Sequence, residues 1–294
     1  MEINNKRNSF LESVLYGVCM GIFEVVPGIS GGTLALILNI YETLIFAISN
    51  LKKDFKNSVK ILLPYLLGMG IGVYCFSFVI SFLHKKFPME VNFWLMGLII
   101  GIIPSIASKA KKYVNSDNFS GKLSCFFSFG LTILVMFLIN YFSFNLNNTN
   151  EIIESLDFFN GLKFMLVGAL ASFCLMLPGC SGSLIMLVFG TYYSVINSIH
   201  TFNFNIIIVV GIGILLGLLI GSKIIGYCLQ NFRAQTFFAI LGLIIGSVFS
   251  PFLNFLKTCS GLINLNFLLL HGSFSIITLV VGVIFSLKLD SYNK

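Results

Sequence analysis

The chain has 294 residues, of which 57% are hydrophobic and only 10% are charged. An ordinary soluble domain carries about 25% charged residues, so this composition excludes a water-soluble globular protein. The net charge of +7 does not indicate nucleic-acid binding. The basic residues stand in short segments between long apolar runs, where the positive-inside rule of membrane proteins accounts for them. We therefore expect an all-α polytopic membrane protein.

The first half of the chain, residues 1–142, predicts a broken hairpin followed by three membrane spans. Two arms flank a Pro-Gly-x-Ser-Gly turn within 11–51, and apolar runs follow at 61–83, 91–107 and 123–142. Each run approaches the roughly 20 residues that cross a hydrocarbon core. A hairpin arm of about 16 residues extends only roughly 24 Å as a helix, and the turn is uncharged. We therefore expect a re-entrant hairpin; two full spans with the turn in water are the alternative.

A polar, acidic linker at 143–160 leads to a second half at 161–294, which repeats the first. It contains a hairpin at 161–199 and apolar runs at 206–226, 236–253 and 267–287. Residues 17–50 align without gaps onto 168–201, which places Pro27-Gly28-Ile29-Ser30-Gly31-Gly32 on Pro178-Gly179-Cys180-Ser181-Gly182-Ser183. Self-similarity at a fixed offset indicates two equivalent structural units.

The positions of the basic residues predict that the two units are inverted in the membrane. A hairpin plus three spans makes an odd number of crossings, so the second unit begins on the opposite side. With a cytoplasmic N-terminus, all Lys and Arg residues fall on the cytoplasmic side except Lys85, Lys86, Lys163 and Lys257, as the positive-inside rule requires. We therefore expect both termini in the cytoplasm and the 143–160 linker outside.

Inverted repeats with broken helices are typical of secondary transporters. Non-helical backbone at membrane depth is tolerated only where protein or a water-filled cavity covers it. We therefore expect the two turns to meet near the midplane of the bilayer and to form a transport site that is open to one side at a time.

Both turns carry the residue types that bind anions. Glycines leave backbone N–H groups uncovered, hydroxyl groups add donors, and each turn opens a helix whose N-terminus is partly positive. Such places bind phosphate. The alternative is that these small residues serve only close helix packing, but two inverted copies favour a site. The candidate substrate-binding residues are Gly28, Ser30, Gly31, Gly32, Thr33, Gly179, Ser181, Gly182 and Ser183.

Four charged residues are further candidates. Glu24 lies inside the first hairpin, where a carboxylate is costly and marks function by default. We expect it to carry a proton or couple transport to an ion; a structural pair with a cation or a backbone donor is the alternative. Glu42 is a weaker candidate for the same role. Lys223 and Arg233 are candidate cations for an anionic head group, although snorkelling to the membrane surface also explains Lys223.

The sequence does not indicate an enzyme, and we expect neither a cofactor nor a metal site. The three histidines are far apart and the seven cysteines are irregularly spaced, so neither a ligand set nor a disulfide framework is indicated. Residues 28–32 match the G-x-S-x-G nucleophile pattern. That motif requires a strand-to-helix elbow and a His–acid pair, and neither is predicted near this segment.

At these motifs the chain resembles the bacterial polyprenyl-phosphate transporters, a family formerly known as a membrane domain of unknown function. The resemblance covers about 11–287. It rests on Met20-Gly21, on Glu24-Val25-Val26-Pro27-Gly28-Ile29-Ser30-Gly31-Gly32-Thr33, on Ile40-Tyr41-Glu42 and on Leu177-Pro178-Gly179-Cys180-Ser181-Gly182-Ser183. The family position matching Glu24 is acidic, often Asp. Cys180 stands where Ile or Val is expected, which leaves the hydrogen-bond donors of the turn unchanged.

The resemblance implies a flippase that moves undecaprenyl phosphate across the bacterial cytoplasmic (inner) membrane, so that the lipid carrier of cell-wall synthesis is recycled. A polyprenyl-phosphate lipid and the bilayer are then the partners of the protein. The residues themselves indicate an anion site but not a lipid. From them, a transporter of a small soluble anion remains the main alternative, and a membrane lipid phosphatase, a channel or a scaffold are weaker ones.

Overall fold

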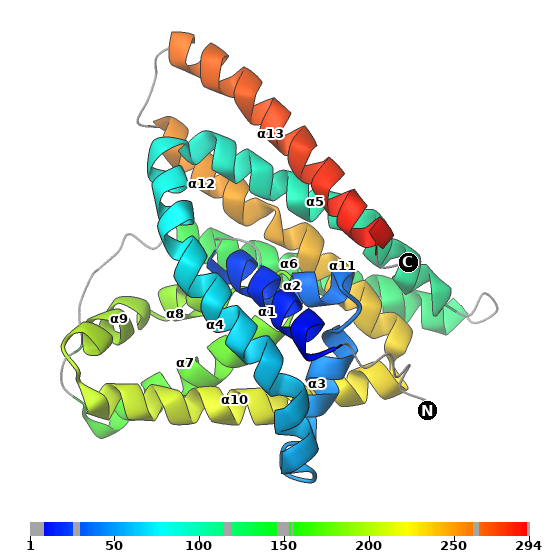
Figure 1. The fold of residues 1–294 in the computed structure, drawn as a ribbon, viewed down its shortest axis with the longest axis vertical. Coiled ribbons are helices and arrows are strands. Elements are labelled where there is room, and N and C mark those ends of the chain that lie inside the picture. The colour runs from blue at the N-terminus through cyan, green and yellow to red at the C-terminus, as the bar shows by residue number, and fades with distance from the viewer. Residues whose placement is uncertain are drawn as a thin grey trace.

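The described part of the protein is built from α-helices. The computed structural model describes residues 9–25, 30–114, 119–145, 153, 156–260 and 265–292, and these contain no β-strand (Figure 1). The helices of the first half are α1 (Phe10–Val25), α2 (Gly31–Ile37), α3 (Tyr41–Ser49), α4 (Phe55–Lys86), α5 (Pro88–Lys112) and α6 (Phe119–Asn145). Those of the second half are α7 (Phe158–Met176), α8 (Gly182–Val188), α9 (Tyr192–His200), α10 (Phe204–Asn231), α11 (Arg233–Ser247), α12 (Phe249–Ser260) and α13 (Leu265–Tyr292).

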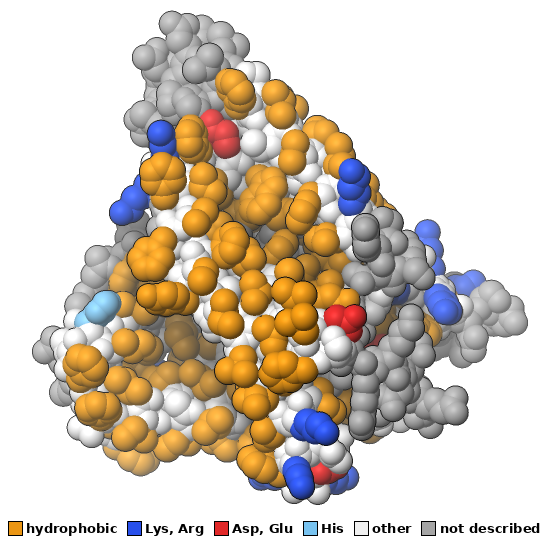
Figure 2. Space-filling view, viewed as in Figure 1, with side chains coloured by type: hydrophobic (Ala, Val, Ile, Leu, Met, Phe, Trp, Pro, Cys, Tyr) orange, Lys and Arg blue, Asp and Glu red, His pale blue; other side chains and the backbone are white. Residues whose placement is uncertain are grey.

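Length and surface composition confirm an all-α polytopic membrane protein. Seven stretches of the described helices are long and apolar enough to cross a membrane, and two bent helix pairs would raise the number to nine. Hydrophobic side chains cover most of the face seen in Figure 2, and the Lys and Arg side chains lie toward its edges. Such a surface suits lipid, because a water-facing surface requires charged groups spread over it.

The spans in α5 and α11 form the centre of the molecule. In each of these two spans, 56% of an apolar 18-residue stretch is buried inside the protein. The corresponding share in the other candidate spans is 17–28%. The largest hydrophobic cluster includes Leu95, Ile102 and Ile106 of α5 together with Ile240 and Ile244 of α11. The second Pro-Gly turn lies beside this centre, because Gly179 approaches the backbone of Leu243 and Ile244 in α11.

Each half contains a bent helix pair after its Pro-Gly turn. The pairs α2–α3 and α8–α9 are bent by 119° and 108°, and their bounds differ by the same 151 positions as the sequence repeat. Asn39 and Gly190 at the two bends have φ values of 57° and 66°. Asn and Gly adopt this left-handed conformation most readily. The sequence placed a break only at each Pro-Gly turn, and the structure adds a second break within the arm that follows the turn, at these two bends.

Within each half, two helices touch backbone to backbone. In the first half α1 packs on α4, and in the second α7 packs on α10. A Cβ atom added to Gly17 would lie 2.3 Å from the carbonyl oxygen of Tyr65, and one added to Gly213 would lie 2.2 Å from that of Met165. Only glycine permits this approach, which is the usual way in which membrane helices pack closely.

The remaining helices pair across the two halves. Helix α5 packs against α13, α6 packs against α11, and α5 and α11 also contact each other. Glycines line these contacts too: Gly97 lies against the backbone of Leu279, and Gly242 against Phe129. Each half therefore packs its last long helix on the central helix of the other half, and the two repeats are interleaved.

Candidate functional site

Ser30 and Thr33, at the start of α2, lie against the second Pro-Gly turn. The backbone N–H of Gly179, in the second turn, donates to Thr33 Oγ1 at 2.9 Å and to Ser30 Oγ at 3.3 Å. The two hydroxyl oxygens are 3.4 Å apart, and both side chains are almost completely buried. Ser30 and Thr33 thus share one donor, the N–H of Gly179, which lies 149 and 146 positions further along the sequence. Three of the predicted site residues are brought together by this contact.

The position of Gly179 requires glycine for two reasons. Its φ value is +85°, a conformation that other L-residues rarely adopt. A Cβ atom there would lie 3.0 Å from the carbonyl oxygen of Leu243 in α11. The second turn is therefore held between the hydroxyls of the first turn on one side and the central helix α11 on the other.

Glu24 lies next to the first turn and accepts a hydrogen bond from it. The backbone N–H of Gly31, the first residue of α2, donates to Glu24 Oε2 at 2.8 Å. The first N–H groups of a helix have no partner within the helix and favour negative charge. The carboxylate thus occupies the kind of position that an anionic ligand would take. This is the pairing with a backbone donor that the sequence left open as the alternative for Glu24.

The first hairpin also rests on the carbonyl end of α7. Tyr41 is buried, and its hydroxyl donates to the backbone oxygen of Met176 at 3.1 Å. A Cβ atom on Gly32 would lie 3.4 Å from the same oxygen. The sequence analysis named Tyr41 only within the motifs of the family resemblance and predicted no contact for it. Its hydrogen bond links the first hairpin to the last residue of α7 in the second hairpin.

The second turn is more open than the first. The hydroxyls of Ser181 and Ser183 lie 2.7 Å apart; Ser181 is partly exposed and Ser183 is exposed. Gly182 is buried, and a Cβ atom there would lie 2.8 Å from the backbone oxygen of Ala171. The remaining predicted turn residue, Gly28, lies outside the described residues. The two turns therefore repeat in sequence but differ in exposure.

The structure brings two of the charged candidates together. Arg233, the first residue of α11, forms an ion pair of 2.5 Å with Glu42 in α3. Its guanidinium group also lies 4.5 Å from the centre of the Tyr113 ring. Lys223 is exposed on α10, and none of the ion pairs among the described residues involves it. Sequence reasoning named both Glu42 and Arg233 but did not predict that they meet.

One contact beside the site was not predicted at all. Lys109, near the end of α5, donates to the backbone oxygen of Leu36 at 3.1 Å and to the side-chain oxygen of Asn39. A cation at the carbonyl end of α2 complements the helix dipole and holds the bend at Asn39. The sequence treated Lys109 only as one of the cytoplasmic charges. No group of three metal-binding side chains occurs among the described residues.

Comparison with known proteins identifies the family. A family model described as undecaprenyl phosphate translocase-like matches residues 20–266. The polyprenyl-phosphate transporter of Staphylococcus aureus is 33% identical over 248 residues, which cover 82% of this chain and 85% of the relative. The polyprenyl-phosphate transporter of Vibrio cholerae is 26% identical over 257 residues, covering 83% and 78% respectively. No solved structure matches the chain. The matched region contains both turns and most of the long helices, and the chain belongs to the undecaprenyl phosphate translocase-like family.

Proposed function

We propose that this protein is a flippase that carries undecaprenyl phosphate across the bacterial cytoplasmic membrane, with the phosphate head group bound at the paired turns. The observation that carries this proposal is the contact of Gly179 with Ser30 and Thr33, which places two hydroxyl groups of the first half and a backbone N–H of the second half at one point. Polyprenyl phosphate is named for the relatives from Staphylococcus aureus and Vibrio cholerae, and its phosphate matches the chemistry of the turns.

The physical task of such a protein is to move one charged group through an apolar core. The prenyl tail stays in lipid throughout, so only the phosphate needs a polar path. An unpaired charge at this depth is costly. Fixed N–H and hydroxyl groups lower that cost because they form charge-assisted hydrogen bonds with the anion. The two turns supply such donors without adding a fixed cation that would retain the head group.

The unequal exposure of the two turns supports alternating access. The hydroxyls of Ser30 and Thr33 are buried and already bonded, while Ser183 is exposed and Ser181 partly so. A transporter in one of its end states has this asymmetry, because its site is open on one side and closed on the other. We propose that the structure corresponds to the state in which the second turn receives the head group.

The proposal also includes the orientation of the protein in the membrane. With both termini in the cytoplasm, repeats at 1–142 and 161–294 are inverted and the 143–160 linker is outside. The second turn then receives lipid from the outer face, and the first turn delivers it inward, which is the direction that recycling of the lipid carrier requires. The distribution of basic residues supports this orientation.

Transport in vesicles tests the proposed site. Ser181→Ala removes a hydroxyl of the open turn and Ser30→Ala one of the closed turn. Each lost hydrogen bond to a charged group should weaken apparent affinity about tenfold to a hundredfold. Ser77→Ala is the matched control, because among the described residues that hydroxyl bonds only to Tyr74 of its own helix α4. The measurement is inward movement of labelled undecaprenyl phosphate.

Two results would count against the proposal. If both serine variants transport like the wild type, the head group does not use the paired turns. If the wild type moves inorganic phosphate but not the lipid, the protein is a transporter of a soluble anion.

A further inference from the structure

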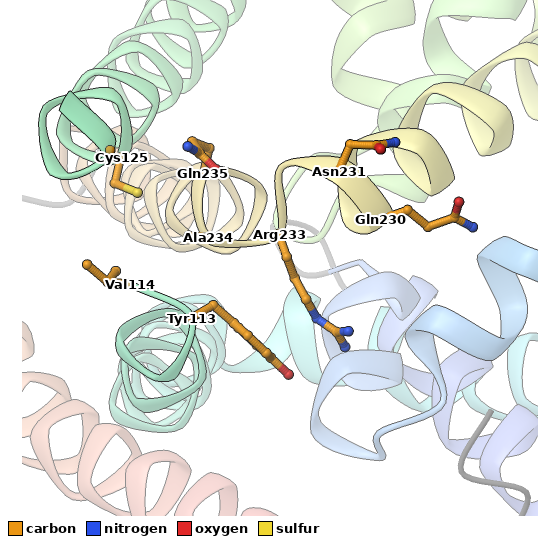
Figure 3. A pocket seen from close by; sticks show the side chains of 9 residues that line it. Tyr113, Val114, Cys125, Gln230, Asn231, Arg233, Ala234 and Gln235 are labelled. Carbon is orange, nitrogen blue, oxygen red and sulfur yellow. The ribbon is translucent and has the colours of Figure 1, made fainter. Parts of the chain in front are cut away.

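A cavity of about 310 Å³ lies between the ends of α5, α6, α10 and α11 (Figure 3). Its lining includes Tyr113, Cys125, Gln230, Asn231, Arg233 and Gln235. It is separate from the paired turns: Gly179 contacts α11 at Leu243, ten residues after Arg233, which is about 15 Å along a helix. The contacts of the two turns do not involve this cavity, so the cavity calls for a separate explanation.

Arg233 supplies the positive charge of this cavity, and its hydrogen-bonding capacity is not used up. One terminal nitrogen pairs with Glu42, but Nε is buried and has no hydrogen-bond partner among the described residues. A buried donor without a partner is costly. The guanidinium group has five N–H donors in a fork that matches phosphate oxygens. An anion in the cavity would therefore complete the bonding of Arg233.

An aromatic stack holds the guanidinium group in place. The ring of Tyr113 lies 4.5 Å from it and stacks on Phe237, with 5.3 Å between the ring centres. In Figure 3 the side chain of Arg233 extends from the start of α11 toward Tyr113. Stacking on an aromatic face leaves the N–H edge of the guanidinium group free for an oxyanion. The charge is thus positioned before any ligand binds.

The surroundings of the cavity attract anions. Lys111 and Lys112 end α5 directly before Tyr113, and Lys122 stands one position after Gly121 on the lining. All three side chains are partly or fully exposed. On the proposed orientation this end of the bundle faces the cytoplasm. Exposed cations next to a cleft raise the local concentration of anions there.

We propose that this cavity binds a phosphomonoester head group through Arg233, and that the incoming phosphate displaces Glu42. The inference rests on the proposed function and extends it: the cavity is the site that binds the lipid phosphate when it reaches the cytoplasmic side. Glu42 belongs to α3 of the first hairpin, so its displacement breaks the ion pair that ties this hairpin to α11. Arrival of the phosphate and release of the hairpin are thereby linked.

A local probe tests the cavity separately from the turns. In an otherwise cysteine-free full-length chain, Gln230→Cys places one exposed thiol on the cavity lining. Its alkylation rate is measured with increasing farnesyl phosphate, a short soluble prenyl phosphate. Farnesol has the same tail without the phosphate, and inorganic phosphate has no tail. We expect farnesyl phosphate to slow alkylation, with inorganic phosphate weaker and farnesol without effect.

Substitutions then assign the effect to Arg233. Arg233→Gln should raise the half-protecting concentration about tenfold to a hundredfold. Arg233→Lys, which keeps the charge but not the fork, should fall between. Glu42→Gln should lower it, because the competing carboxylate is gone, whereas a purely structural ion pair would give weaker protection on its loss. Lys163→Gln, which removes an exposed cation of the same half on α7, is the matched control and should change nothing.

The proposal is overturned if farnesol protects as well as farnesyl phosphate, if Arg233→Gln leaves protection unchanged, or if Glu42→Gln weakens it. Equal protection by inorganic phosphate would assign the cavity to a free anion and remove it from lipid transport. In each case the serine variants still report on the turns: if transport remains sensitive to Ser181→Ala, the proposed function stands without the cavity.

Discussion

The hydrogen bond that joins the two turns can be tested by removing its two acceptors separately and together. Thr33→Val and Ser30→Ala each remove one hydroxyl. In either single variant the N–H of Gly179 keeps the other acceptor, so each should lower the free energy of unfolding by about 0.5–1.5 kcal/mol. In the double variant this buried N–H has no acceptor left, which adds a desolvation penalty of about 1–3 kcal/mol. The loss in the double variant should therefore exceed the sum of the single losses.

The assay is SDS-induced unfolding of the purified protein in mixed micelles, with all variants measured under one condition. Ser183→Ala is the control, because in the described part of the chain its exposed hydroxyl bonds only to Ser181, and it should change stability by less than about 0.5 kcal/mol. Distant, independent sites are additive within about 0.5 kcal/mol. Additivity of Thr33→Val and Ser30→Ala within that margin would show that the two hydroxyls do not share Gly179, and the contact between the turns would have to be abandoned.

Three further predictions concern the turns and the orientation. Gly179→Ala should destabilise the protein by at least about 1–2 kcal/mol, the cost of left-handed backbone for an L-residue, in the same unfolding assay; a stability equal to the wild type would contradict the geometry of the second turn. Glu24→Gln keeps an oxygen that can accept the Gly31 N–H but cannot titrate, so we expect transport of labelled undecaprenyl phosphate to persist and to lose its dependence on pH. A wild-type pH profile in this variant would rule out a proton-coupling role. In a cysteine-free chain, Lys112→Cys should react with an impermeant thiol reagent from the cytoplasmic side and Lys163→Cys from the outside; labelling of both from one side would exclude inverted halves.

Hydropathy and the repeat predict much of this fold because they act through local sequence. The all-α membrane architecture follows from the length of the apolar runs, and the equivalence of the two halves follows from a gap-free alignment. The bends were missed although a signal was present: the alignment places Asn39 opposite Gly190, and these are the two residue types that accept a positive φ. Reading the repeat for backbone conformation as well as for motifs would have found both breaks.

The pairing of helices across the two halves was not predictable in the same way. Glycines such as Gly97 and Gly242 indicate that a neighbouring helix comes close, but they do not indicate which helix. The same limit applies to the ion pair of Glu42 and Arg233. These residues are 191 positions apart, and no periodic pattern relates them; only the packing of α3 near the start of α11 brings them into contact.

Among the positions at which the two copies of the repeat differ, one changes the charge next to the turn. Glu24 in the first half corresponds to Leu175 in the second. The first turn thus carries its own carboxylate, which accepts the Gly31 N–H, whereas the second turn has an apolar residue at the equivalent place and exposes its serine hydroxyls.

Within the proposed function, this difference gives the two turns different tasks. An anion can approach the second turn without displacing a charged group, but at the first turn it must compete with Glu24 for the same donor. A head group would therefore bind first at the second turn, on the outer side in the proposed orientation, and would reach the first turn only when Glu24 withdraws. In this scheme the carboxylate of Glu24 is what distinguishes the turn of exit from the turn of entry.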